Sequence, residues 1–150
     1  MTTTYHLFDV AERIEVVSAE IYGALAIVWA GDADAKALFG QLQDEELQHA
    51  ARVRLLAARY RHDPRIVRLA TADGGELERL LVDAEAMLGD IRAGRWPHAL
   101  AETKRRLAEM ELRTERAHAE FLSKGADAAL REFFEQLAQQ DDAHRALLAE

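Results

Sequence analysis

Residues 20–49, EIYGALAIVWAGDADAKALFGQLQDEELQH, decide the fold, because their pattern recurs in residues 115–144, ERAHAEFLSKGADAALREFFEQLAQQDDAH. A constant shift of 95 with no gap superimposes the two segments. The aligned positions that carry metal-binding side chains are Glu20 and Glu115, Glu46 and Asp141, and His49 and His144. Each half therefore has a lone carboxylate and, 26 residues later, a carboxylate followed three residues on by a histidine. Four-helix bundles use such a set to hold two metal ions, so the repeat predicts a di-metal site.

The composition is typical of a globular, helical protein. Of the 150 residues, 49% are hydrophobic and 31% are charged, and only two are proline. We expect them to form one domain, residues 1–150. The net charge of −8 argues against nucleic acid or an anionic membrane as a partner. The absence of cysteine excludes disulfides, thiolate catalysis and thiolate-bound zinc.

The sequence predicts no export and no membrane insertion. Residues 1–10 lack the basic region and apolar run that are typical of a secretory signal. The longest apolar stretch without charge, residues 21–31, is far shorter than the ~20 residues that span a bilayer. We therefore expect a cytoplasmic protein.

Helical periodicity extends over most of the chain. Apolar residues recur at intervals of three and four in segments of about 7–30, 35–61, 97–124 and 127–149. Each half is then an antiparallel hairpin, 7–61 and 97–149, because only a few residues join its two helices. The connection 63–96 contains a fifth predicted helix, 76–92, which would cover about 25 Å. The predicted fold class is all-α: a ferritin-like four-helix bundle with one long crossover carrying an additional helix.

The six candidate ligands lie among apolar helical neighbours. Glu20, for example, has Val16, Val17, Gly23 and Ala24 within one turn and Ile27 two turns away on the same side. An unpaired carboxylate in such a stripe is costly to desolvate. For any one residue alone, the alternative is a buried polar group that a hydrogen bond or an arginine satisfies. Six metal-capable residues at matched offsets in two halves favour the di-metal interpretation.

His118 is the candidate catalytic residue. It follows Glu115 by three residues and therefore faces the same way, and the shift of 95 aligns it with Gly23. We interpret it as a proton donor. The alternatives are a seventh ligand, a partner of Glu111, or a solvent-exposed residue.

Two further residues close to the candidate ligands are not predicted to bind metal. Glu45 lies about 100° around the helix from Glu46, which indicates a surface residue or a partner of a ligand. Tyr22 is two positions from Glu20 and is predicted to point elsewhere on its helix.

The segments AEIYGALAIVWAGDADAKALFGQLQDEELQHA (19–50) and LRTERAHAEFLSKGADAALREFFEQLAQQDDAHRALL (112–148) resemble the rubrerythrin-like branch of the ferritin-like superfamily. The resemblance spans the four bundle helices but not the crossover. It implies terminal ligands at Glu20 and Glu115, bridging or semi-bridging ligands at Glu46 and Asp141, and one imidazole ligand per metal from His49 and His144. Asp141 replaces the usual Glu and is one methylene shorter. His118 stands where rubrerythrins often place an additional Glu. We expect no rubredoxin-like domain, because the sequence has no cysteine.

Oxygen and nitrogen donors without thiolates suit iron or manganese. The predicted function is therefore a non-haem di-iron protein that reduces hydrogen peroxide or dioxygen while oxidising Fe(II). Its cofactors would be two iron ions, with manganese or a mixed pair as alternatives, and its electrons would come from an external donor. The alternatives are a ferroxidase protein for iron handling or storage, and a helical interaction module with a vestigial site. A homodimer is compatible with the sequence. The mismatches of Glu46 with Asp141 and of Gly23 with His118 predict inequivalent metal positions.

Overall fold

The fold is described from a computed structural model, which describes residues 4–60, 75–96, 99–124 and 128–150. Within these ranges the chain forms five α-helices and no strand. They are α1 (Thr4–Val28), α2 (Ala33–Tyr60), α3 (Gly75–Arg92), α4 (Leu100–Lys124) and α5 (Ala128–Ala149). The all-α prediction is confirmed. Each predicted helix is present, with ends that differ by a few residues from those expected.

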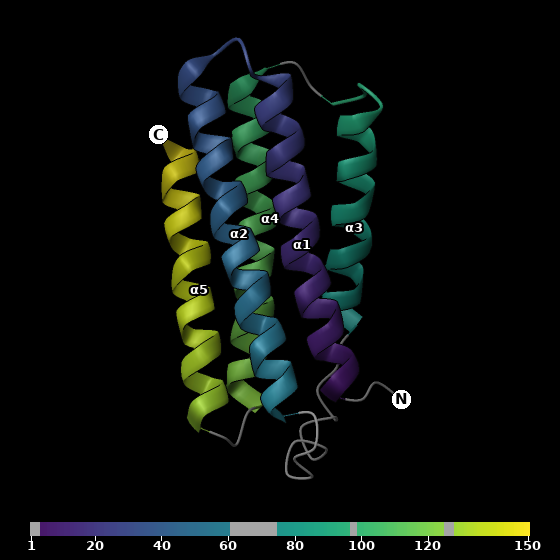
Figure 1. Ribbon diagram of the computed structural model, residues 1–150, viewed down its shortest axis with the longest axis vertical. Coiled ribbons are helices and arrows are strands. Elements are labelled where there is room, and N and C mark those ends of the chain that lie inside the picture. The colour runs from purple at the N-terminus through teal and green to yellow at the C-terminus, as the bar shows by residue number, and fades with distance from the viewer. Residues whose placement is uncertain (1–3, 61–74, 97–98, 125–127) are drawn as a thin grey trace.

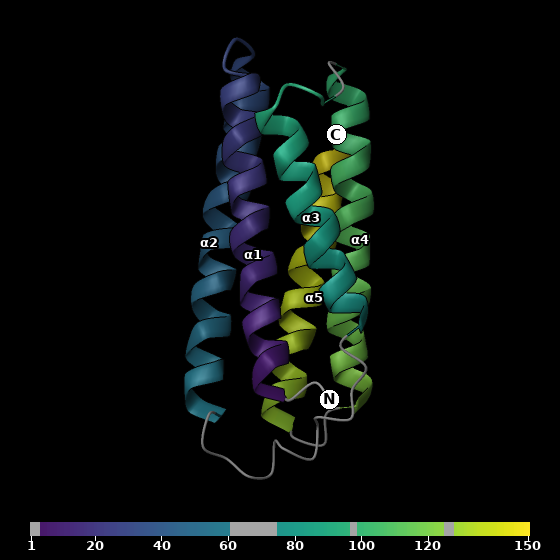
Figure 2. The same ribbon diagram turned by 90° about the vertical axis from the view of Figure 1, so that its right-hand side faces the viewer.

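The helices lie side by side along the long axis of the molecule (Figure 1). α1 packs on α2 and α4 packs on α5, and α2 and α5 are also in contact. α3 lies on the outside, against α1 and α4, as Figure 2 shows. The pairing of Arg54 with Glu12, and of Phe39 with Tyr22, confirms that α1 and α2 run antiparallel.

Two helix ends are fixed by local hydrogen bonds. The Asp32 carboxylate accepts the backbone N–H groups of Asp34 and Ala35, each at 3.1 Å, so Asp32 is the N-cap of α2. After α3 the backbone N–H of Arg95 donates to the carbonyl of Asp90 at 2.9 Å, and Gly94 has a φ of 73°. This is the Schellman arrangement, in which a left-handed residue is cheapest as glycine.

Two apolar clusters fill the interior. One contains Phe39 and Leu42 of α2 and Leu148 of α5. The other contains Val53 and Ala57 of α2 and Leu130, Phe134 and Leu137 of α5. Between them, both helices present polar residues: Glu46 and His49 from α2, and Asp141 and His144 from α5, each at most 3% exposed. The carboxylate-x-x-histidine pairs therefore lie in a dry layer between two apolar ones, where charge is expensive unless it is paired or bound to metal.

None of the described helices is long and apolar enough to cross a membrane.

Candidate metal centre

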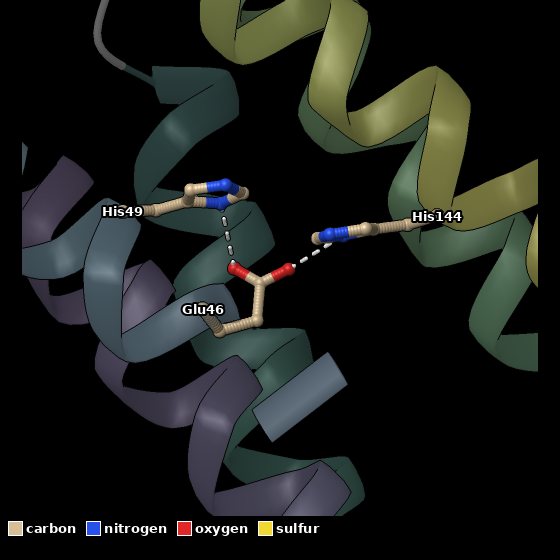
Figure 3. A group of neighbouring side chains, drawn as sticks. All are labelled: Glu46, His49 and His144. Carbon is tan, nitrogen blue, oxygen red and sulfur yellow. Dashed lines mark ion pairs between the residues drawn. The ribbon is translucent and has the colours of Figure 1, made fainter. Parts of the chain in front are cut away.

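The centre is built around Glu46 and the two predicted imidazole ligands. Oε1 of Glu46 is 2.9 Å from Nδ1 of His144, and its Oε2 is 3.5 Å from Nδ1 of His49. Figure 3 shows the carboxylate of Glu46 between the two rings, one from each half of the chain. The rings are nearly parallel, with centroids 5.4 Å apart. Three-residue spacing on each helix places carboxylate and imidazole on the same face, so two helices deliver all four predicted side chains.

α1 and α4 complete the cluster with Glu15 and Glu111, not with the glutamates that the repeat predicted. Glu15 is 1% exposed and Glu111 is 2% exposed. Oε2 of Glu15 lies 3.8 Å from Nδ1 of His49, and Oε1 of Glu111 lies 3.5 Å from Nδ1 of His144. Each half therefore contributes one carboxylate from its first helix.

The structure does not bring Glu20 and Glu115 into the centre. Glu20 lies toward the surface, 3.4 Å from the guanidinium of Arg92 on α3, with a third of its side chain exposed. Glu115 is 2.7 Å from the guanidinium of Arg145 on α5. Both form an ion pair with an arginine, which is the alternative that the sequence left open for a single buried glutamate.

The true internal symmetry has two offsets. A shift of 95 aligns α2 with α5, whereas a shift of 96 aligns α1 with α4 and superimposes Glu15 on Glu111. Residues 29–32 join the first pair of helices and residues 125–127 join the second, one residue fewer. The sequence did contain a signal for the shift of 96. Seven residues after Glu15, this shift also aligns a second pair of side chains that can form hydrogen bonds, Tyr22 and His118.

Tyr22 and His118 make the same crossed contact, each with the glutamate of the other half. The Tyr22 hydroxyl donates to Oε1 of Glu111 at 2.5 Å, and Nε2 of His118 lies 3.4 Å from Oε1 of Glu15. Tyr22 points elsewhere on its helix than Glu20, as expected, but it is Tyr22 that is fully buried in the centre and Glu20 that lies toward the surface. Burial and the charges of Glu111 and Glu46 raise the pKa of Tyr22 well above the usual value, so it stays protonated as a donor.

His118 is also part of the cluster and not a surface residue. It is 1% exposed, and its Nδ1 lies 2.7 Å from Oδ2 of Asp141. Both ring nitrogens thus face carboxylates, one from α1 and one from α5. Asp141 points one of its oxygens at His118, whereas its counterpart Glu46 points both oxygens at imidazoles.

Glu45 contacts a candidate ligand, in agreement with one of the two interpretations of this residue. Its Oε2 is 2.7 Å from Nε2 of His144, and its Oε1 accepts a hydrogen bond from Gln41 at 3.0 Å. A carboxylate on one imidazole nitrogen fixes the tautomer and leaves the other nitrogen free for metal. In the second half the matching position is Gln140, whose side chain is neutral.

The carboxyl groups keep the buried imidazoles protonated in the absence of metal. Burial alone lowers the pKa of an imidazole, but here the neighbouring carboxyl groups outweigh it. The pKa rises to about 9 for His49, about 10 for His118 and about 11 for His144. The carboxyl groups responsible are Glu15 and Glu46 for His49, Asp141 and Glu15 for His118, and Glu111 and Glu46 for His144.

The carboxyl groups themselves divide in their acidity. Burial and the charges of Glu15 and Glu111 raise the pKa of Glu46 well above its usual value. Burial also raises the pKa of Asp141 to about 7, although His118 partly opposes it. Burial works against ionisation of Glu15 too, but the Glu46 carboxyl and the His118 imidazole outweigh it and hold its pKa well below the usual value. Unequal environments thus set unequal charges on chemically similar groups.

The donor set fits divalent metal ions. Ligand atoms of Glu46, His49 and His144 all lie within 4.8 Å of one another, and so do those of Glu111, Asp141 and His144. Among the described residues, Oε1 of Glu15 and Nδ1 of both His49 and His144 are buried and make ion-pair contacts, but they have no hydrogen-bond partner. Buried polar atoms are normally satisfied, so such atoms call for an ion or another partner. These buried groups can hold a metal ion.

Comparison with known proteins gives no relative from which a role can be transferred. No protein-family model matches the chain, and no curated protein and no solved structure matches it either.

Proposed function

We propose that the protein is a ferritin-like, non-haem di-iron oxidoreductase that reduces hydrogen peroxide or dioxygen. One observation supports it above all: four helices bring four buried carboxyl groups and three buried imidazoles to one layer of the interior. They are Glu15, Glu46, Glu111 and Asp141, with His49, His118 and His144. In the ferritin-like arrangement, one carboxylate from each of two helices and a carboxylate-x-x-histidine from each of the other two hold two metal ions.

The charges of the cluster support a pair of divalent ions. Four ionised carboxylates carry about −4, which two divalent cations neutralise while the imidazoles bind in their neutral form. Without metal, the imidazoles hold protons instead, as their raised pKa values require. Metal and protons thus compete for the same buried negative charge. Thiolates are absent from the sequence, and carboxylate and imidazole donors suit iron or manganese.

The proposed ligand roles follow from the contacts. Glu46 faces both imidazole ligands, so it would hold metal together with each of them. Glu15 and His49 would complete one position, and His144 with Glu111 the other. Asp141 stands near this second position, with one oxygen held by His118.

The proposed chemistry is a two-electron reduction. Two Fe(II) ions held by these residues would supply the two electrons that convert one hydrogen peroxide and two protons into two water molecules. His118, which is protonated and faces Glu15, would hold one of the two protons at the centre, and solvent would supply the other. Repeated turnover would need a separate one-electron donor to reduce both Fe(III) ions again.

The cost of the cluster favours this proposal over a helical interaction module with a vestigial site. Burying a charged group is unfavourable unless it is paired or coordinates a metal. A packed apolar layer of similar volume is often as stable as a buried ionic one, or more so. A protein that only binds partners through the outer surface of the bundle would therefore gain no stability from these seven buried side chains.

Single-turnover spectroscopy tests the proposal. The metal-free protein is loaded with two equivalents of Fe(II) without oxygen and is mixed separately with peroxide and with dioxygen. We expect diferric absorption with at least one oxidant in the wild type and in Glu20→Gln, and its loss in Glu46→Gln. No diferric absorption with either oxidant would contradict the redox function. Light scattering distinguishes self-contained iron storage, which requires a large shell.

A further inference from the structure

The two halves of the centre differ in how many ligand atoms are free. In the first half, Oε1 of Glu15 and Nδ1 of His49 are buried without a hydrogen-bond partner among the described residues. Oε1 of Glu15 has a long contact of 3.4 Å with Nε2 of His118, and Nδ1 of His49 lies 3.5 Å from Oε2 of Glu46. A metal ion that binds Glu15, Glu46 and His49 would therefore displace the long contact with His118 but no short hydrogen bond to Oε1 of Glu15 or Nδ1 of His49.

In the second half the carboxylates are already engaged. Oε1 of Glu111 accepts the 2.5 Å hydrogen bond from Tyr22, and Oδ2 of Asp141 lies 2.7 Å from Nδ1 of His118. Each carboxylate therefore offers one remaining oxygen. Among the described ligand atoms of this half, Nδ1 of His144 is the one without a hydrogen-bond partner, although it lies 2.9 Å from Oε1 of Glu46. Asp141 is also one methylene shorter than its counterpart Glu46 in the first half.

Resting on the proposed di-metal function, we propose that the two positions fill in a fixed order. The position formed by Glu15, Glu46 and His49 binds the first ion. The position formed by Glu111, Asp141 and His144 binds the second, and Tyr22 is its positioning residue. The difference between the two positions comes from the protein, because side chains at matched places in the two halves make different contacts.

Tyr22 is the residue that isolates the second position. Its hydroxyl contacts Glu111, whereas His118 contacts carboxylates of both halves. Hydrogen bonds to a ligating carboxylate fix the direction of its free oxygen, and their loss typically weakens metal binding by about 10–100-fold. Tyr22→Phe removes one oxygen atom and keeps the ring that packs on Phe39, so the fold is retained.

Calorimetric titration of the metal-free protein with Co(II), a probe that needs no redox step, tests the order. We expect two separate binding steps in the wild type. In Tyr22→Phe the second step should weaken by about 10–100-fold and the first should stay unchanged. The matched pair His49→Gln and His144→Gln should lose the first and the second step respectively, with folding checked by circular dichroism.

The outcomes separate this inference from the proposed function. Two ions that bind in equal, independent steps would overturn the order and leave the di-metal proposal standing. An equal effect of Tyr22→Phe on both steps would overturn the role of Tyr22. Survival of the tighter step in His49→Gln would overturn the assignment of the first position. Complete absence of Co(II) binding would overturn both the order and the di-metal function.

Discussion

At the residue scale, the decisive difference is between two glutamates on the same helix. α1 buries two stripes, one through Val17 and Ile21 and another through Glu15 and Tyr22. Glu20 belongs to neither, and it ends at Arg92. A glutamate that can reach an arginine at the surface needs no metal, whereas one enclosed with imidazoles gains from binding one.

Paired substitutions at these positions test the assignment. Glu15→Gln removes a buried ligand charge, and we expect it to lower the metal bound from about two ions per chain to about one. Glu20→Gln changes the same atoms on the same helix but should leave the content near two, because its salt bridge is exposed and contributes less than about 1 kcal/mol. Elemental analysis of metal-loaded, desalted protein measures both. A loss in Glu20→Gln with none in Glu15→Gln would restore the ligands first predicted.

Glu45 offers a second test at this scale. It touches Nε2 of His144 but lies outside the proposed ligand set. Glu45→Gln should weaken binding at the His144 position by about 10–100-fold while the fold and the first position are kept. The neighbouring exposed Asp44 provides the control, since Asp44→Asn should bind Co(II) as the wild type does. Equal isotherms for the two variants would show that Glu45 does not orient the imidazole.

At the element scale, helix periodicity carries most of the information. Asp32 shows how local this information is. Its carboxylate caps α2 by accepting the N–H of Asp34, only two residues further along the chain. We expect Asp32→Ala to lower the free energy of unfolding by about 1 kcal/mol and the melting temperature by about 2–4 °C. Asp34→Ala removes only a charge that interacts favourably with the helix dipole, so it should lower the free energy of unfolding by only a few tenths of about 1 kcal/mol. Thermal denaturation of the metal-free proteins measures the difference, and equal losses would argue against the cap.

The same scale explains what the sequence could and could not predict. Each helix was predictable because its apolar spacing and its caps lie within a few residues of one another. The ligands of α2 and α5 were predictable for the same reason, since carboxylate and histidine are one turn apart. Glu15 and Glu111 were not, because one residue fewer between α4 and α5 reduces the offset from 96 for the first helices of the two pairs to 95 for the second helices. The outward stripe of α1 also carries Val16 and Ile27, which made Glu20 look enclosed.

At the scale of the whole molecule, the centre ties folding to pH and to metal. In the metal-free protein, the folded-state pKa of each imidazole lies above the unfolded value of 6.5. Their contribution to stability is therefore complete below about pH 6.5 and is lost as the pH rises through 9 and beyond. Glu46 and Asp141, with raised pKa values, act in the same direction, because ionising a buried carboxyl group as the pH rises lowers the stability of the fold. For Asp141 this loss lies between its unfolded pKa of 3.8 and about 7. Glu15 acts oppositely, since its lowered pKa stabilises the fold above 4.5 and is lost below it.

Metal reverses this dependence, because its ligands bind only when they are deprotonated. We expect the melting temperature of the metal-free protein to fall between about pH 6.5 and pH 9, and the stabilisation by Mn(II) to grow over the same interval. Thermal denaturation with chelator and with excess Mn(II), at several pH values, measures both curves. His144→Gln, which lacks the imidazole with the highest pKa, should flatten the metal-free curve. Parallel curves with and without metal would show that protons and metal do not compete for the buried carboxylates, and would remove the central electrostatic support for a di-metal site.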